Sequence, residues 1–476
     1  MPFPDLALVV FVQAALLAAV VILREPKLLI PAVVIGLPVE YLQTETVGTL
    51  GEGGIGGAIR AMLNPGKAAM AATVVIALWR ARYEPRRLLP RSGVLLPALV
   101  ILFLSVGGLA WSDLQRPNNA VLILVLYVAF VFVAPSLLED RRDLERVLAA
   151  FFLAAIGLSL LAVAQRLLGV FQWRAALIQS DAFSYRSNAT FADPNNLARL
   201  LAITMALAAA SILALGPRRL TVYLAAPALL LAAPALIATA SRSGWLGMLL
   251  ASFIVVLLAP VGRYTKGRLA VFAVGTLAVL LGLLLVQGGA DAARVRSLAG
   301  GVDAVLGVRQ FLIRAGWEMW KDNPLVGVGT GGYQNALLIA YNYVMPYWAK
   351  TSLSHTSVLS ILAEWGLVGV AAFAFFAGRV GASCARIYRS AGDPFERMLG
   401  GWLVAAFVEI LFQSQSEGRL FEEPYLWLLI ALVAALEAGA GRRVPAAVPA
   451  AADAPAAAAP AAAAPAPPRE PAPAPA

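Results

Sequence analysis

Three residues of this sequence combine reactive side chains with flanking residues that suit a reaction site: Arg186, Arg242 and His355. Arg242 separates two apolar runs in Ala-Thr-Ala-Ser-Arg-Ser-Gly-Trp, where small neighbours would let a large anionic head group approach. Arg186 precedes a predicted helix start at Asp193 and Pro194, and that helix start gives it no structural duty. A guanidinium binds phosphate oxygens bidentately and keeps its charge, so both arginines could clamp an anion. The structural alternatives are an interfacial arginine that reaches into water and a solvated arginine.

His355 is the only histidine of the chain and lies in Ser-Leu-Ser-His-Thr-Ser. Its side chain can gain or lose a proton near neutral pH, and nearby arginines would favour the neutral imidazole that a general base needs. A surface or capping histidine is the alternative. A multi-histidine zinc site is excluded, and the single cysteine, Cys384, excludes an intrachain disulfide.

Composition predicts the elements that position these residues. Of the 476 residues 60% are hydrophobic and 13% are charged, which indicates a membrane protein. Judged against the ~20 residues that cross a bilayer, the apolar runs predict an all-α polytopic membrane protein with about 12–13 transmembrane helices. The runs begin near Leu6, Leu28, Ala68, Val94, Ala120, Leu144, Leu197, Thr221, Trp245, Leu269, Thr356, Met398 and Pro424. Pro31 and Pro38 break up the second run.

Lysine and arginine residues gather in alternate loops and predict the orientation. These loops hold Arg80, Arg82, Arg86, Arg87 and Arg91; Arg141, Arg142 and Arg146; Arg218 and Arg219; Arg263, Lys266 and Arg268; and Arg379, Arg386, Arg389 and Arg397. By the positive-inside rule that side is cytoplasmic, which explains the net charge of +10 without nucleic acid. The opposite, outer side then receives the loops at about 165–198 and 288–354 and the turn at Arg242. Glu40 and Glu409, in or near apolar runs, are expected to make helix–helix or substrate contacts.

The second of these loops should contain an amphipathic helix. From Val302 to Lys321 apolar residues recur at helical spacing, which predicts a helix lying on the membrane, ended by Asp322-Asn323-Pro324. Gly327, Gly329 and Gly332 match a dinucleotide-binding pattern, but no strand precedes them, so we reject that interpretation. Residues 1–443 are predicted to form the membrane domain. The Ala- and Pro-rich residues 444–476 are predicted to form a disordered cytoplasmic tail.

The order and spacing of these stretches resemble the O-antigen ligase and O-antigen polymerase superfamily of bacterial envelope glycosyltransferases. The resemblance covers roughly 165–436. Its matching stretches are 186–198, 241–244, 309–332 and 355–369, the last with Gly366 ten intervening residues after His355. The family commonly has Asn, Ser or Gln after the histidine, whereas this sequence has Thr356. A hydroxyl here can still donate a hydrogen bond, so the difference concerns only the orientation of the histidine.

The resemblance implies a type C glycosyltransferase-like fold and a glycan donor carried on undecaprenyl pyrophosphate. The acceptor would be a hydroxyl of lipid A core or a similar glycan, and the enzyme would be multi-pass in the bacterial inner membrane. Arg186 and Arg242 would hold the pyrophosphate, with Arg309 or Arg314 as further contacts. His355 would deprotonate the acceptor hydroxyl, which would attack the anomeric carbon in line and invert its configuration. Neither a metal nor another cofactor is expected, since the carboxylates of the outer loops are scattered in sequence; membrane lipids are expected partners and nucleic acid is not.

Other functions stay open from the sequence alone. An O-antigen or exopolysaccharide polymerase would use the same chemistry with a lipid-linked repeat as acceptor. A lipid-linked glycan transporter would show internal repeats and sites at the bilayer midplane, whereas the candidate residues here cluster outside the hydrocarbon. A structural envelope scaffold is the remaining alternative.

Overall fold

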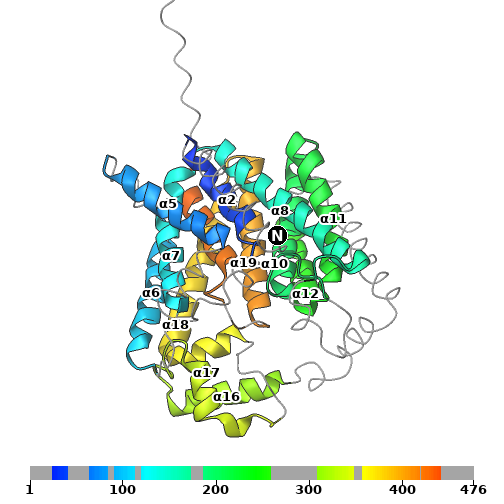
Figure 1. The fold of residues 1–476 in the computed structure, drawn as a ribbon. Coiled ribbons are helices and arrows are strands. Elements are labelled where there is room, and N and C mark those ends of the chain that lie inside the picture. Colours follow the sequence, from blue (N-terminus) through cyan, green and yellow to red (C-terminus); the bar gives the residue numbers. More distant parts are fainter. Residues whose placement is uncertain are drawn as a thin grey trace, which may run out of the picture.

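The computed structural model describes residues 24–40, 64–83, 90–112, 119–172, 186–258, 308–347, 356–416, 418 and 420–440. Within these residues every regular element is a helix, as predicted (Figure 1). The main helices are α2 (Leu29–Gly36), α5 (Pro65–Ala81), α6 (Leu95–Gly107), α7 (Asn119–Val133), α8 (Arg141–Leu168), α10 (Pro194–Leu215), α11 (Ala226–Ala238), α12 (Arg242–Leu258), α16 (Arg309–Asp322), α17 (Gly332–Ile339), α18 (Ser357–Ser390), α19 (Pro394–Ser414) and α20 (Pro424–Glu437).

Several of these helices are long and apolar enough to cross a membrane. In the described part of the chain five segments meet both criteria: Ala120–Leu137, Arg141–Leu168, Pro194–Leu215, Thr221–Ala238 and Ser357–Ser390. Shorter apolar helices accompany them, among them α6, α12 and α20. The prediction of a polytopic helical membrane protein is therefore confirmed. The spans predicted near Leu6 and Leu269 lie outside the described residues, so the total number stays a prediction.

One end of the bundle gathers basic loops and is called here the basic end. Lys27 before α2 contacts Asp143 of α8 at 2.9 Å, and Arg141 lies 3.6 Å from Asp393, which caps α19. Arg386 near the end of α18 pairs with Glu437 of α20 at 2.7 Å. These contacts bring two of the predicted arginine loops, those of Arg141 and Arg386, to a single end together with Lys27.

The other ends of the same helices meet at the opposite end, called here the Asn195 end. Ser241, just before α12, donates a hydrogen bond to Asn195 of α10 at 2.8 Å. Ser357 at the start of α18 donates to the carbonyl of Ser414 at the end of α19, also at 2.8 Å. Gln165 near the end of α8 accepts from the backbone N–H of Ala189. The candidate arginines thus lie at the end away from the basic loops.

Helices α16 and α17 lie together at one end of the bundle, and both contact α18 (Figure 1). The apolar stripe predicted for this segment is present in α16, where Leu312, Ala315 and Met319 are buried. It packs against α17 and α18, with Gly316 in close contact with Leu359. The expectation that this stripe faces the membrane was therefore wrong, because the same periodicity serves packing within the protein. Residues 302–307 lie outside the described part.

Candidate functional site

Arg186 is held firmly beside the ends of α10 and α11. Its Nε donates to the carbonyl of Thr239 at 2.9 Å, and its Nη2 donates to Oδ1 of Asn195 at 2.9 Å. The next residue is fixed as well, because Ser187 donates through its backbone N–H to Ala238 and through its hydroxyl to Ala162. The guanidinium is therefore oriented by a buried segment of chain rather than by a loose loop.

The turn before Arg242 shares a partner with Arg186. Oδ1 of Asn195 accepts hydrogen bonds from both Arg186 and Ser241, so one amide oxygen joins the two arginine-bearing segments. Ser241 also accepts the backbone N–H of Gly244 at 3.2 Å, which caps the first turn of α12. Arg242 begins α12 and is partly buried. The structure thus brings Arg186 and the Arg242 turn into one corner.

The close approach of α10 and α12 explains the small residue after this turn. A Cβ built on Gly244 would lie 2.5 Å from Cβ of Ala198, a distance that real Cβ atoms do not adopt. Larger residues would push α12 away from α10 and separate Ser241 from Asn195. The predicted cap of α10 is confirmed: Asp193 accepts the backbone N–H of Asn195 at 2.8 Å, with Pro194 in the first turn.

A buried ion pair behind this corner went unnoticed in the sequence. Arg199 of α10 is 2% exposed; its Nη1 pairs with Glu423, the N-cap of α20, and its Nε donates to Gln413 of α19 at 2.9 Å. Gln413 also faces α12, since a Cβ on Gly244 would lie 3.2 Å from its Nε2. A lone arginine in an apolar run was the signal available in the sequence.

The two suspected glutamates contact other segments of the protein. Oε2 of Glu40 accepts the backbone N–H of Ala192 at 2.6 Å, which ties the chain after α2 to the loop before α10. Glu409 is fully buried in α19 against α12, where a Cβ on Gly247 would lie 2.9 Å from its Oε1. Both glutamates therefore make the contacts between segments that their apolar surroundings suggested.

His355 lies outside the described residues. The helix that follows it begins at the same corner: Ser357 of α18 contacts Ser414, and the backbone N–H of Val358 donates to Gln415 at 3.3 Å. Because Gln413 of that same turn of α19 contacts Arg199, the start of α18 and the arginine corner are neighbours.

Arg309 and Arg314 belong to a different part of the structure. Arg309 is the first residue of α16 and partly buried, and Arg314 is exposed on the same helix. Within this cluster the hydroxyl of Tyr341 donates to Asp322 at 2.7 Å, and burial together with this carboxylate raises the pKa of Tyr341 to about 12. The structure therefore joins Arg186 with the Arg242 turn, and places Arg309 and Arg314 on the α16–α17 cluster.

Gly366 interrupts α18 and receives the segment after α16. Its backbone has φ 60° and ψ −154°, a conformation essentially reserved for glycine. The interruption exposes backbone groups: the carbonyl of Ala363 accepts from Val328 at 2.9 Å, and the N–H of Leu367 donates to Pro324 at 2.9 Å. A Cβ on Gly366 would lie 2.3 Å from the carbonyl carbon of Leu325. The glycine at this spacing thus anchors the α16–α17 cluster to the bundle.

The glycine-rich pattern at Gly327 to Gly332 does not form a phosphate cradle in this structure. Glu364 of α18 accepts the backbone N–H groups of Gly331 at 2.9 Å and of Tyr333 at 3.3 Å, at the start of α17. A carboxylate of the protein itself occupies the position at which an anion would bind to a helix N-terminus. This agrees with our rejection of the motif.

The fold defines a multi-pass helical membrane protein with a polar, arginine-containing corner at one end of its bundle. Residues 227–374, about a third of the chain, match the family model described as O-Antigen ligase. The matched stretch contains Arg242, Arg309, Arg314, His355 and Gly366, whereas Arg186 and Arg199 precede it. No curated protein matches the chain. The family match confirms the resemblance to the O-antigen ligase and polymerase superfamily, and with it a ligase- or polymerase-like function in general terms.

Proposed function

We propose that this protein transfers a glycan from undecaprenyl pyrophosphate to an acceptor hydroxyl, in lipid A core or a similar saccharide, at the periplasmic face of the bacterial inner membrane. The observation that carries the proposal is the shared contact of Arg186 and Ser241 with Oδ1 of Asn195. Two hydrogen bonds of Arg186, to Asn195 and Thr239, orient its guanidinium at this corner. A guanidinium held in a fixed direction suits a site for an anionic substrate, because its planar donors match phosphate oxygens.

The chemistry requires a stabilised leaving group. When the bond between the anomeric carbon and the phosphate oxygen breaks, its electron pair stays on the lipid pyrophosphate. Arg186 and Arg242 would bind the oxygens that gain this charge, and preorganised charge of this kind contributes a few kcal/mol in transition states. His355 would accept the proton of the acceptor hydroxyl, which attacks from the opposite face and inverts the anomeric configuration. Arg309 and Arg314 are further candidates for phosphate or glycan contacts. No metal takes part in this proposal.

Arg199 would act as a positioning residue. Its charge is balanced by Glu423 in a buried pair, so its role is to hold Gln413 and the end of α19 against α12. Gln413 lies next to Gly244 at the Arg242 turn, and Ser414 beside it accepts a hydrogen bond from Ser357 at the start of α18. A scaffold with buried, satisfied hydrogen bonds keeps the reacting groups at fixed separation.

The orientation follows from the charge distribution. The basic end would face the cytoplasm by the positive-inside rule, which leaves the Asn195 end in the periplasm with the lipid-linked donor. The membrane domain would extend over residues 1–443, with 444–476 as a cytoplasmic tail. These boundaries stay a prediction, since 441–476 lie outside the described residues.

The test is transfer by the purified protein in liposomes that contain an undecaprenyl-pyrophosphate-linked glycan. Arg242→Ala should abolish transfer while the variant remains folded, and Arg219→Ala, an exposed arginine before α11, should transfer normally. Normal turnover by Arg242→Ala would contradict the clamp. Offering lipid A core and the lipid-linked repeat in separate reactions identifies the acceptor. Lengthening of the lipid-linked glycan without any core would identify a polymerase.

A further inference from the structure

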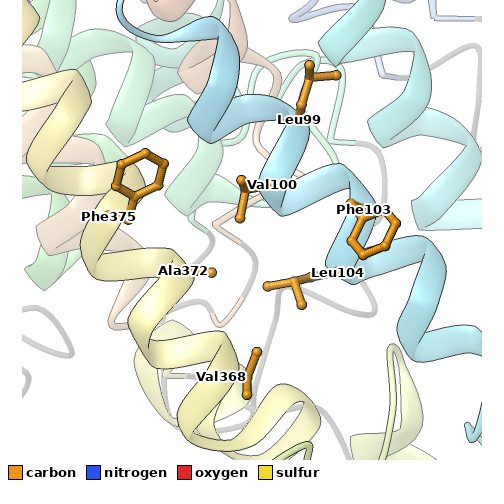
Figure 2. Close-up of a pocket in the computed structure, with 7 residues that line it drawn as sticks. All are labelled: Leu99, Val100, Phe103, Leu104, Val368, Ala372 and Phe375. Carbon is orange, nitrogen blue, oxygen red and sulfur yellow. The ribbon is translucent and has the colours of Figure 1, made fainter.

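An apolar groove lies between α6 and α18 on the outside of the bundle. Its volume is about 470 Å³, and seven side chains line it: Leu99, Val100, Phe103 and Leu104 from α6, and Val368, Ala372 and Phe375 from α18 (Figure 2). Val100 and Leu104 of α6 point toward Ala372 and Val368 of the neighbouring α18, while Leu99 and Phe103 lie on the more exposed side of α6. Both helices are apolar in this region, so hydrocarbon rather than water fills such a groove in a bilayer.

A cationic group lies beyond one end of the groove. Arg379 follows Phe375 by one helical turn on α18 and is exposed at the basic end. Its Nε donates to the carbonyl of Gly93 at 3.4 Å, a long hydrogen bond. Within the described residues Arg379 forms no ion pair. Its charge is therefore available to an anion at this edge of the membrane.

The turn before α6 approaches this arginine closely at Gly93. A Cβ on Gly93 would lie 3.0 Å from Nη2 of Arg379 and 3.1 Å from Oγ of Ser383. The hydroxyl of Ser383 is buried and has no hydrogen-bond partner among the residues that the structure describes. A guanidinium and an unsatisfied hydroxyl thus lie around one glycine, at the end of an apolar groove.

The neighbouring charges do not serve the same purpose. Glu437 accepts hydrogen bonds from Ser92 at 2.6 Å and from the N–H of Gly93 at 2.8 Å, and it pairs with Arg386. Arg386 is therefore already balanced by a carboxylate, whereas Arg379 is not. The contrast singles out Arg379 as the arginine that a lipid phosphate would contact.

We propose that an anionic phospholipid of the leaflet at the basic end binds here, with its phosphate on Arg379 and one acyl chain in the groove. The dimensions agree with one leaflet. From Arg379 to Val368 the helix rises about 16 Å at 1.5 Å per residue. Half of a ~30 Å hydrocarbon core is about 15 Å. Phosphatidylglycerol offers the required phosphate without a cation of its own, whereas phosphatidylcholine carries a compensating charge.

This lipid is distinct from the proposed glycan donor, because the donor's pyrophosphate site lies at the other end of α18. The groove ends near the interruption at Gly366, where the N–H of Val368 donates to the carbonyl of Leu325 at 3.2 Å. A bound chain would therefore press α6 and α18 together next to the segment that anchors the α16–α17 cluster. Binding should raise the stability of the protein with no glycan present.

The test compares the full-length protein in nanodiscs of phosphatidylcholine with and without phosphatidylglycerol, using native mass spectrometry for retained lipid and thermal unfolding for stability. Wild-type protein should retain phosphatidylglycerol and unfold at higher temperature when it is present. Arg379→Gln should weaken retention roughly fivefold, the effect of one arginine near an anionic lipid surface. Arg389→Gln, an exposed arginine of the same helix farther from the groove, should retain the lipid as wild type does.

A second pair of variants tests the groove itself. Ala372→Leu would fill the groove and should abolish retention, while Ala374→Leu, at an exposed position nearby, should not. Unfolding temperatures in phosphatidylcholine alone show whether each variant is folded. Equal retention by the Arg379→Gln and Arg389→Gln proteins would overturn the proposal, as would wild-type protein that retains both lipids equally. If Ala372→Leu fails to fold, the comparison of Arg379→Gln with Arg389→Gln still tests the proposal.

Discussion

Replacing Arg199 by methionine should destabilise this protein strongly, because the change leaves Glu423 without its partner in the interior. Both side chains are buried, with Arg199 at 2% and Glu423 at 7% exposure. Removing one member of such a pair typically costs about 3–5 kcal/mol, since an uncompensated carboxylate remains out of water. Gln413, which is fully buried, also loses its donor from Arg199. We expect a loss of stability in this range.

A second substitution separates the buried charge from the lost packing. Glu423→Gln removes the charge but keeps an oxygen that can accept the N–H of Tyr425, as Glu423 does at 3.1 Å at the start of α20. The double variant Arg199→Met with Glu423→Gln should therefore recover most of the stability and lie within about 1 kcal/mol of wild type. It should still transfer glycan more slowly, because Gln413 no longer holds α19 in place.

The assay is equilibrium unfolding in mixed detergent micelles, with transfer measured on the same preparations. Arg146→Met is the control: this arginine pairs with Glu25 at 2.7 Å, with the two side chains 41% and 47% exposed, and Asp143, which lies 3.6 Å from it, keeps its ion pair with Lys27 when Arg146 is replaced. Exposed pairs contribute about 0–1 kcal/mol. If Arg199→Met lowers the free energy of unfolding no more than Arg146→Met does, the Arg199–Glu423 pair is not buried in the folded protein. If the double variant transfers at the wild-type rate, Arg199 has no positioning role.

Three further substitutions test the corner and the interruption of α18. Asn195→Ala removes the oxygen shared by Arg186 and Ser241 and should slow transfer on the order of 100-fold, because the two arginine-bearing segments would be misplaced. Asn196→Ala should transfer near the wild-type rate. Equal transfer rates for the two variants would rule out a role for the shared contact. Gly366→Ala should lower the free energy of unfolding by about 1–3 kcal/mol from backbone strain alone, besides its clash with Leu325. Gly378→Ala on the same helix meets no atom within 4 Å and should be neutral or stabilising in the unfolding assay. His355→Gln should abolish transfer but leave binding of labelled donor intact; retained transfer would exclude the general base.

The sequence predicted the fold well where local chemistry determines it. Asp193 and Pro194 predicted the start of α10 because a capping carboxylate and an N1 proline act within one turn. Apolar length likewise predicted the long spans. The environment of α16 could not be predicted in this way, since an apolar stripe has the same spacing whether it faces lipid or protein. Only the neighbouring α17 and α18 decide that question.

The candidate site shows the corresponding limit. Asn195 was not singled out as a site residue in the sequence, because nothing local indicates that its amide joins residues 9 and 46 positions away. Arg199 was missed for the same reason: its partner Glu423 is 224 residues distant, so the sequence displays the buried charge without its compensation. Gly366 was noted for its spacing from His355, while its conformational role depends on the approach of Leu325.

Carboxylate partners indicate which arginines of this protein have a structural role. At the basic end, Arg141 and Arg386 contact carboxylates, and so does Arg199 inside the bundle. A carboxylate partner cancels most of the attraction that a phosphate would feel, and such an arginine contributes structure instead. The hydrogen bonds from Arg186 to Asn195 and Thr239 fix the direction of its guanidinium at the corner that it shares with Ser241. At the far end of α18, Arg386 pairs with Glu437, whereas Arg379 donates to the carbonyl of Gly93, a neutral oxygen, so Arg379 is the arginine there that an anionic lipid would contact.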